Sequence, residues 1–170
     1  PGYTEDAAAV ILDSVVQIDD SELALSGDFA GASLTLARHG GASTQDIFDF
    51  KAIGSLFAVS GNELRAGSLL GPAFATFTNA DGLLTINFTS AATTATSALV
   101  NDVGQHLTYA NTSDSPPATV QIDWTFDDGN TGAQGSGGAL SATGSTTVKI
   151  TNVNDLPTGA VTISGTASQG

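Results

Sequence analysis

Short segments in which apolar and polar residues alternate recur along this chain, and they constrain its fold more than any other feature. In the clearest one, residues 119–126, apolar side chains occupy every second position: Val120, Ile122, Trp124 and Phe126. A period of two residues puts successive side chains on opposite faces of an extended strand. This segment is therefore predicted to be a β-strand with one buried face, with Trp124 in the core.

Further strands are predicted where short apolar or alternating segments are bounded by turn residues, at residues 15–18, 33–38, 47–51, 57–64, 73–78, 83–88 and 146–153. Two of the connections have the composition of tight hairpins. Residues 60–63 interrupt one apolar segment, and Asp81-Gly82 lies between two others. Short strands at this spacing, joined by turns, predict a β-sandwich.

One stretch, residues 94–107, departs from this period. Its apolar side chains fall four residues apart, as on one side of a helix: Leu99, Val103 and Leu107. Thr93 or Thr94 is placed to cap such a helix. We therefore expect one short amphipathic helix, interrupted near Gly104, that covers an open end or a face of the sandwich. Asp102 is expected on its solvated side.

The charge of the chain excludes several classes of function. Its 170 residues include 17 acidic and 4 basic side chains, and the formal net charge is −13. This charge repels phosphate backbones and anionic lipid, so binding to nucleic acid or to a membrane surface is not expected. No apolar run approaches the length of a membrane span, about 18 residues, and no signal peptide is expected. Disulfides and thiol chemistry are excluded because the chain has no cysteine.

Three stretches together carry a family resemblance. They are YTED at residues 3–6, LTYANTS at 107–113 and VKITNVNDLP at 148–157. In combination they resemble the cadherin-like repeat modules of very large bacterial secreted and surface proteins, including adhesins of the RTX type. The resemblance covers about residues 3–157, so residues 1–157 are assigned to one module. Residues 158–170 are similar to the opening of a following Ig-like repeat.

The resemblance implies an Ig/cadherin-like Greek-key β-sandwich that binds Ca²⁺ near its junctions with neighbouring repeats. Glu5 corresponds to the early acid of such modules, and Asn154-Asp155 to the core of their calcium-binding linker. Asn152 stands where that linker has its first Asp, and Leu156 where it has a final Asn, so fewer ions or weaker binding are expected. The resemblance also implies an extracellular location at a bacterial surface. The expected partners are neighbouring repeats of the same chain, and an isolated module is expected to be monomeric.

Two further acidic clusters are candidate Ca²⁺ sites, because this ion takes about six to eight oxygen ligands and Asp-rich loops supply them. Asp19, Asp20 and Glu22 follow an expected strand, where unneutralised carboxylates would repel one another. Asp127 and Asp128 follow the clearest strand. The alternatives are an ordinary solvated turn at the first cluster and an Asp-Gly tight turn at the second.

The remaining polar residues do not indicate a catalytic site. His39 and His106 lack the neighbouring ligands typical of zinc sites. Asp46 and Asp49 are expected to be exposed on a strand. The chain has no Gly-Xaa-Ser-Xaa-Gly elbow of the kind that carries a nucleophilic serine. The main hypothesis is therefore a non-catalytic, Ca²⁺-binding structural or adhesive module.

Two alternatives stand beside it. The extra helix and the loops around His39 and residues 129–144 exceed what a spacer needs, which indicates a module that binds carbohydrate or a cell-surface protein. The other alternative is a domain appended to a polysaccharide hydrolase. Glycosidases place two carboxylates across a cleft, and the sequence shows no such pair.

Overall fold

The computed structural model describes residues 1–155 and residue 159. In this part the chain forms eleven strands and two helices. In chain order they are β1 (Gly2–Thr4), β2 (Val10–Ile11), α1 (Ser21–Ser26), β3 (Ser33–Arg38), β4 (Asp46–Phe50), β5 (Phe57–Ser60), β6 (Glu63–Ala66), β7 (Ala73–Ala80), β8 (Leu83–Phe88), α2 (Ser97–Gln105), β9 (Leu107–Asn111), β10 (Thr119–Asp127) and β11 (Ser141–Thr151). The segment assigned to a following repeat, residues 158–170, lies outside the described residues except for Gly159.

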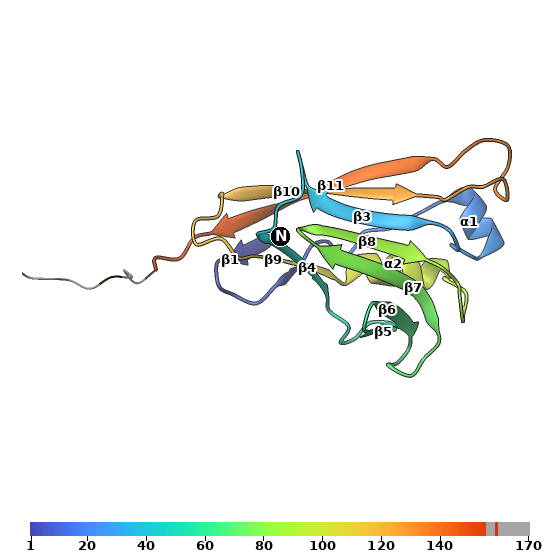
Figure 1. Cartoon of the computed structure of the whole chain (residues 1–170), viewed down its shortest axis with the longest axis horizontal. Helices are drawn as coiled ribbons and strands as arrows, with labels where there is room; N and C mark the ends of the chain where they lie inside the picture. The colour runs from blue at the N-terminus through green and yellow to red at the C-terminus, as the bar shows by residue number, and fades with distance from the viewer. Residues whose placement is uncertain (156–158, 160–170) are drawn as a thin grey trace, which may run out of the picture.

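The strands form two sheets (Figure 1). The larger sheet has eight strands in the order β1-β11-β10-β3-β8-β7-β6-β5, and the smaller has three in the order β2-β9-β4. Among the described strands β1 and β11 pair in parallel, and the other ladders are antiparallel. The prediction of a mainly β fold is confirmed, and the arrangement is consistent with a β-sandwich.

The hydrophobic core lies between the two sheets, and β10 shows why the alternation in the sequence was informative. Its apolar side chains are all buried, as predicted: Val120, Ile122, Trp124 and Phe126. The indole nitrogen of Trp124 donates to Thr146 Oγ1 at 3.1 Å, so the one polar atom of this side chain is satisfied in the core. From the smaller sheet, Phe48 and Tyr109 pack with ring centroids 6.0 Å apart.

Both predicted hairpins are present. The first joins β5 to β6 and the second joins β7 to β8. In the second, Asp81 and Gly82 have φ angles of 55° and 74°, the left-handed conformation that tight hairpins require. A Cβ at Gly82 would lie 1.9 Å from the backbone oxygen of Ser43, so this turn also needs glycine for close approach.

The helix α2 is shorter than the sequence predicts. It begins after Thr96, whose side chain accepts a hydrogen bond from Leu99 N, so the expected cap at residue 93 or 94 was wrong. Gly104 does not interrupt the helix; its Cα faces Val16, and an added Cβ would lie 3.1 Å from Val16 Cγ1. None of the described helices is long and apolar enough to cross a membrane.

The segment at residues 12–20, here called the crossing segment, contains no strand, although residues 15–18 were predicted to form one. Side chains of α2 hold its backbone instead. Asn101 Oδ1 accepts from Ile18 N at 2.6 Å, and Gln105 Nε2 donates to Val16 O at 3.0 Å. Ile18 is buried whereas Val15 is exposed. The apolar run therefore reflects packing on a helix and not pairing in a sheet.

Candidate functional site

The predicted Ca²⁺ ligands lie at two opposite ends of the molecule (Figure 1). Glu5 follows β1 and Asn152 to Asp155 follow β11, at the end from which the chain leaves. The other acids lie around α1 and the loop between β10 and β11, at the far end. The described residues contain no group of three or more His, Cys, Asp or Glu side chains already arranged to hold a metal ion.

At the first end, Glu5 is the best-positioned of the predicted ligands. Its side chain is buried, with 4% of the residue exposed. Glu5 N donates to Thr151 O at 3.0 Å, and Glu5 Oε2 accepts from Val153 N at 2.7 Å. The residue therefore ties the end of β1 to the segment that follows β11.

The second carboxylate oxygen of Glu5 is buried and has no hydrogen-bond partner among the residues that the structure describes. A buried polar atom without a partner is unfavourable, and more so when the group is charged. Asn152, Asn154 and Asp155 follow in the adjacent segment with exposed side chains. The structure thus places one buried carboxylate oxygen next to the segment that carries the other predicted ligands. It does not bring the side chains of those ligands together around that oxygen.

At the second end, Asp20 caps a helix that the sequence analysis missed. Asp20 Oδ1 accepts from Leu23 N at 2.8 Å, and Glu22 lies in the first turn of α1, where a negative charge is favourable. Gly27 ends the helix with φ 72°. The cluster is therefore a helix start and not a solvated turn. The signal was present as an acidic cap residue and a closing glycine, but the run of acids suggested a metal site.

Asp127 and Asp128 hold the ends of the loop between β10 and β11. Asp127 accepts from Gly129 N at 2.9 Å and from Ser141 Oγ at 2.8 Å. Asp128 is 7% exposed, and its Oδ1 accepts from Asn130 N at 3.0 Å and Leu140 N at 2.9 Å. These contacts are those of a structured Asp-Gly turn, and Ca²⁺ binding at this cluster stays a prediction.

The two clusters nevertheless share one cavity of about 480 Å³. Asp19, Asp20 and Glu22 line it from one side, and Asp128 from the other. Gln134 also lines it. Its Nε2 donates to Asp128 O at 3.0 Å, and its buried Oε1 has no partner among the described residues. The tertiary structure therefore brings together two acidic segments that lie more than a hundred residues apart in sequence.

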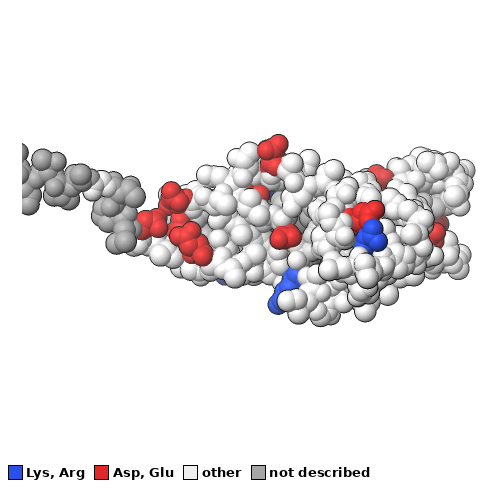
Figure 2. Space-filling model, turned by 60° about the horizontal axis from the view of Figure 1, so that its bottom comes forward, with Lys and Arg blue, Asp and Glu red and all other residues white. Residues whose placement is uncertain are grey.

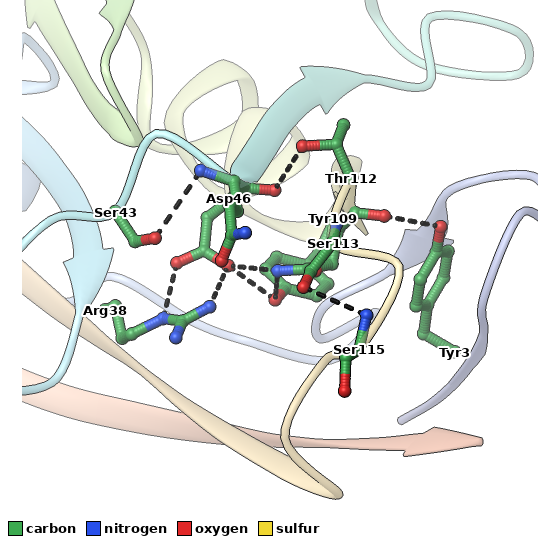
Figure 3. A network of polar contacts seen from close by, with 10 residues as sticks. Tyr3, Arg38, Ser43, Asp46, Tyr109, Thr112, Ser113 and Ser115 are labelled. Atoms are coloured by element: carbon green, nitrogen blue, oxygen red, sulfur yellow. Dashed lines mark hydrogen bonds and ion pairs between the residues drawn. The ribbon is translucent and has the colours of Figure 1, made fainter. Parts of the chain in front are cut away.

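A buried polar network between the sheets was not predicted (Figure 3). Asp46 is 1% exposed, so the expectation that it lies on the surface was wrong. Arg38 Nε donates to Asp46 Oδ2 at 2.7 Å and Arg38 Nη2 to Oδ1 at 2.6 Å. Tyr109 Oη and Asn111 Nδ2 also donate to Oδ1, at 2.7 and 2.9 Å, and Tyr3 Oη donates to Asn111 O at 3.1 Å. This number of donors explains how a carboxylate can be buried here.

The electrostatics of this network suit a structural role. Burial, together with the bond to Asp46, raises the pKa of the Tyr109 phenol well above its ordinary value. The hydrogen bond to Asp46 likewise raises the pKa of Arg38. Tyr109 therefore stays protonated and Arg38 stays charged throughout the physiological range.

The two histidines lie apart from these clusters. His39 Nδ1 lies 2.7 Å from Asp123 Oδ2 on the exposed face of the larger sheet. His106 Nδ1 lies 2.8 Å from Asp102 O at the end of α2. The expectation that Asp102 is solvated was wrong: its side chain is 14% exposed, and its Oδ2 accepts from Leu56 N at 2.6 Å. It holds the start of β5 against α2.

Comparison with known proteins adds no family: no protein-family model, no curated protein and no solved structure matches this chain.

Proposed function

We propose that this chain is a non-catalytic, Ca²⁺-binding structural and adhesive module of an extracellular, multi-repeat bacterial protein. The observation that carries the proposal is the carboxylate oxygen of Glu5 that has no partner within the described part of the chain. It is buried at the point where β1 ends and the segment leading out of the module begins. A hard cation that prefers oxygen ligands would satisfy it, and Ca²⁺ is such an ion.

The neighbouring residues suit this ion. Asn152, Asn154 and Asp155 supply amide and carboxylate oxygens directly after Val153, which already donates its N–H to Glu5. Figure 2 shows that, on the face in view, acidic side chains gather where the chain leaves the module. Repulsion among these acids is what a bound cation would relieve.

The consequence would be mechanical. An ion held by Glu5 and by the linker would fix the direction in which the chain leaves β11, and so the angle between this module and the next. Without the ion, the one hydrogen bond that restrains the described part of the linker, residues 152–155, runs from Val153 N to Glu5 Oε2. This is how the site would turn a row of repeats into an extended, stiff fibre.

Calorimetric titration of the full chain with Ca²⁺, after removal of metal with EDTA, tests the proposal. We expect saturable binding and a rise in melting temperature, and both should be strongly reduced in Glu5→Gln. The matched control is Asp114→Asn, which removes the same charge from an exposed loop carboxylate and should bind Ca²⁺ as the unmodified chain does. Absence of binding, or equal binding by the two variants, would overturn the proposal.

The carbohydrate-binding alternative is not favoured by any observation. Sugar-binding sites commonly stack a ring on an exposed aromatic side chain. Every aromatic side chain of this sequence lies within the described residues, and none is exposed: Tyr3, Phe29, Phe48, Phe50, Phe57, Phe74, Phe77, Phe88, Tyr109, Trp124 and Phe126. Binding to another protein is better supported, on grounds that are independent of the calcium site.

A further inference from the structure

The strand β11 has an open edge over most of its length. It pairs with β10 from Ser141 to Lys149, but β1 covers its other side at Lys149–Thr151 only. Within the described residues, no strand pairs with that other side between residues 141 and 148. Figure 1 shows this half of β11 as the upper border of the larger sheet, on the side of α1.

The register shows which backbone groups are unpaired. Ile150 N bonds to Ala118 O on the β10 side, whereas Lys149 N bonds to Pro1 O on the β1 side. Because the direction of the backbone groups alternates along a strand, residues at odd positions direct their N–H and C=O groups away from β10: Ser141, Thr143, Ser145 and Thr147. Natural edge strands are protected by charge, proline or a bulge. This edge, SATGSTT at residues 141–147, has none of these.

A continuous groove runs beside the open edge. Its central part, about 380 Å³, is floored by Trp124 and Phe126 and walled by the crossing segment. The cavity of about 480 Å³ near α1 continues it at one end through Asp19 and Ala142, and a hollow of about 530 Å³ continues it at the other through Asp13 and Ser145.

The groove exists because β11 has small residues opposite large ones. Gly144 pairs with Trp124, and Ala142 pairs with Phe126. Neither Gly144 nor Ala142 is large enough to cover the aromatic ring of its partner from the edge of the sheet. A hollow therefore remains beside β11 at this point. A further strand beside β11 would bring a side chain into this space and complete the packing.

The charges along the groove define the chemistry of the occupant. Five acids line its three parts, and no Lys or Arg does: Asp13, Asp19, Asp20, Glu22 and Asp128. Asp13 lies at one end of the apolar centre, and Asp19 at the other. A second copy of this chain, with a net charge of −13, would be repelled, whereas a basic segment would be attracted.

We propose that the open edge of β11 binds an extended, basic segment of a partner protein by strand addition. The backbone of that segment pairs with Ser141 to Thr147, a length that accommodates about seven residues at roughly 3.3 Å each. An aliphatic side chain enters the groove over Trp124. Basic side chains two residues before and two residues after it lie on the same face of the added strand, and they reach Asp13 and Asp19.

Two capped synthetic peptides test this directly, TKTVTKT and its acidic counterpart TETVTET. They are titrated into the full chain at low salt in EDTA, so that the result does not depend on Ca²⁺. Trp124 is the only tryptophan, so its fluorescence reports occupation of the groove, and calorimetry gives the affinity. We expect the lysine peptide to bind with a Kd below about 1 mM, at least about tenfold tighter than the acidic peptide, and to weaken at high salt.

Variants of one edge residue separate strand addition from simple charge attraction. Ser145→Pro removes an N–H group that faces away from β10 and should reduce affinity for the lysine peptide by about tenfold or more. Ser145→Ala keeps that N–H and should bind normally. If Ser145→Pro does not fold, the amide resonances of Thr143, Ser145 and Thr147 in the unmodified chain should shift on peptide addition. No binding of the lysine peptide, equal binding of both peptides, unshifted edge amides, or dimerisation of the chain through this edge would overturn the proposal.

Discussion

Arg38 holds Asp46 through both carboxylate oxygens, at 2.7 Å to Oδ2 and 2.6 Å to Oδ1, and so joins β3 of the larger sheet to β4 of the smaller. The contact connects the two layers at a point where Asp46 is almost completely buried. Two more donors to Asp46, the phenol of Tyr109 and the side-chain amide of Asn111, come from β9, the central strand of the smaller sheet. The stability of the chain should therefore depend strongly on this pair.

Replacing Arg38 with Met should lower the free energy of unfolding by about 3–5 kcal/mol, because it leaves the buried charge of Asp46 without its main partner. Denaturant unfolding followed by fluorescence measures the change. The control is Arg65→Met, which removes the partner of Glu63 from a pair that is about one-third exposed and should cost no more than about 1 kcal/mol. Similar losses in the two variants would contradict a special role for Arg38 and Asp46.

The same network predicts a dependence on alkaline pH. Burial raises the pKa of the Tyr109 phenol in the folded state. The stabilisation that results is complete below the ordinary tyrosine pKa of about 10 and is lost as the pH rises toward the folded-state value. In Tyr3→Phe, where Tyr109 is the only tyrosine left, absorbance at alkaline pH should therefore show ionisation only when the chain unfolds. Reversible ionisation near pH 10 with the fold intact would show that the phenol is accessible.

Gly82 should tolerate substitution less well than Gly61, the glycine in the turn of the other hairpin. Both have positive φ angles, 74° and 61°. A Cβ at Gly82 would meet the backbone oxygen of Ser43 at 1.9 Å, whereas a Cβ at Gly61 would meet no atom within 4 Å. Gly61→Ala should lower the free energy of unfolding by about 1 kcal/mol from backbone strain alone, and Gly82→Ala by clearly more. Thermal melting compares them, and an equal effect would remove the case for close packing at Gly82.

Substitutions of Asp20 distinguish its role as a helix cap from a role as a metal ligand. In EDTA, Asp20→Ala should destabilise the chain by about 1 kcal/mol because Leu23 N loses its acceptor. Asp20→Ser should be nearly neutral, because serine also caps helices well. If the serine variant is as unstable as the alanine variant, the carboxylate does more at this position than cap α1. Repeating the comparison in Ca²⁺ then shows whether that additional role is metal binding.

Local patterns explain which parts of the fold were predictable. The strand at Thr119–Asp127 and the turn at Asp81-Gly82 follow from rules that involve neighbouring residues only, and both were predicted correctly. The helix α1 was missed although its cap residue Asp20 and its closing Gly27 are local signals. At six residues it is too short to show an amphipathic period, and its acids invited a different interpretation.

The burial of Asp46 and the partial burial of Asp102 could not be inferred in this way. A carboxylate is buried only where donors from other segments converge on it, and the donors to Asp46 come from Arg38, Tyr109 and Asn111. The conformation of the crossing segment likewise depends on Asn101 and Gln105, which lie in α2. Nothing in the sequence near these residues records such partners.

The sequence by itself determined that this chain is mainly β, where several of its strands and turns lie, and that its acids greatly outnumber its bases. Those properties depend on side-chain period, backbone conformation and composition, which are local or additive. Only the tertiary structure decided which acids are buried, which of them meet across a cavity, and that one edge of β11 is left open beside a groove. These depend on distances between segments far apart in the chain, which are set when the two sheets pack.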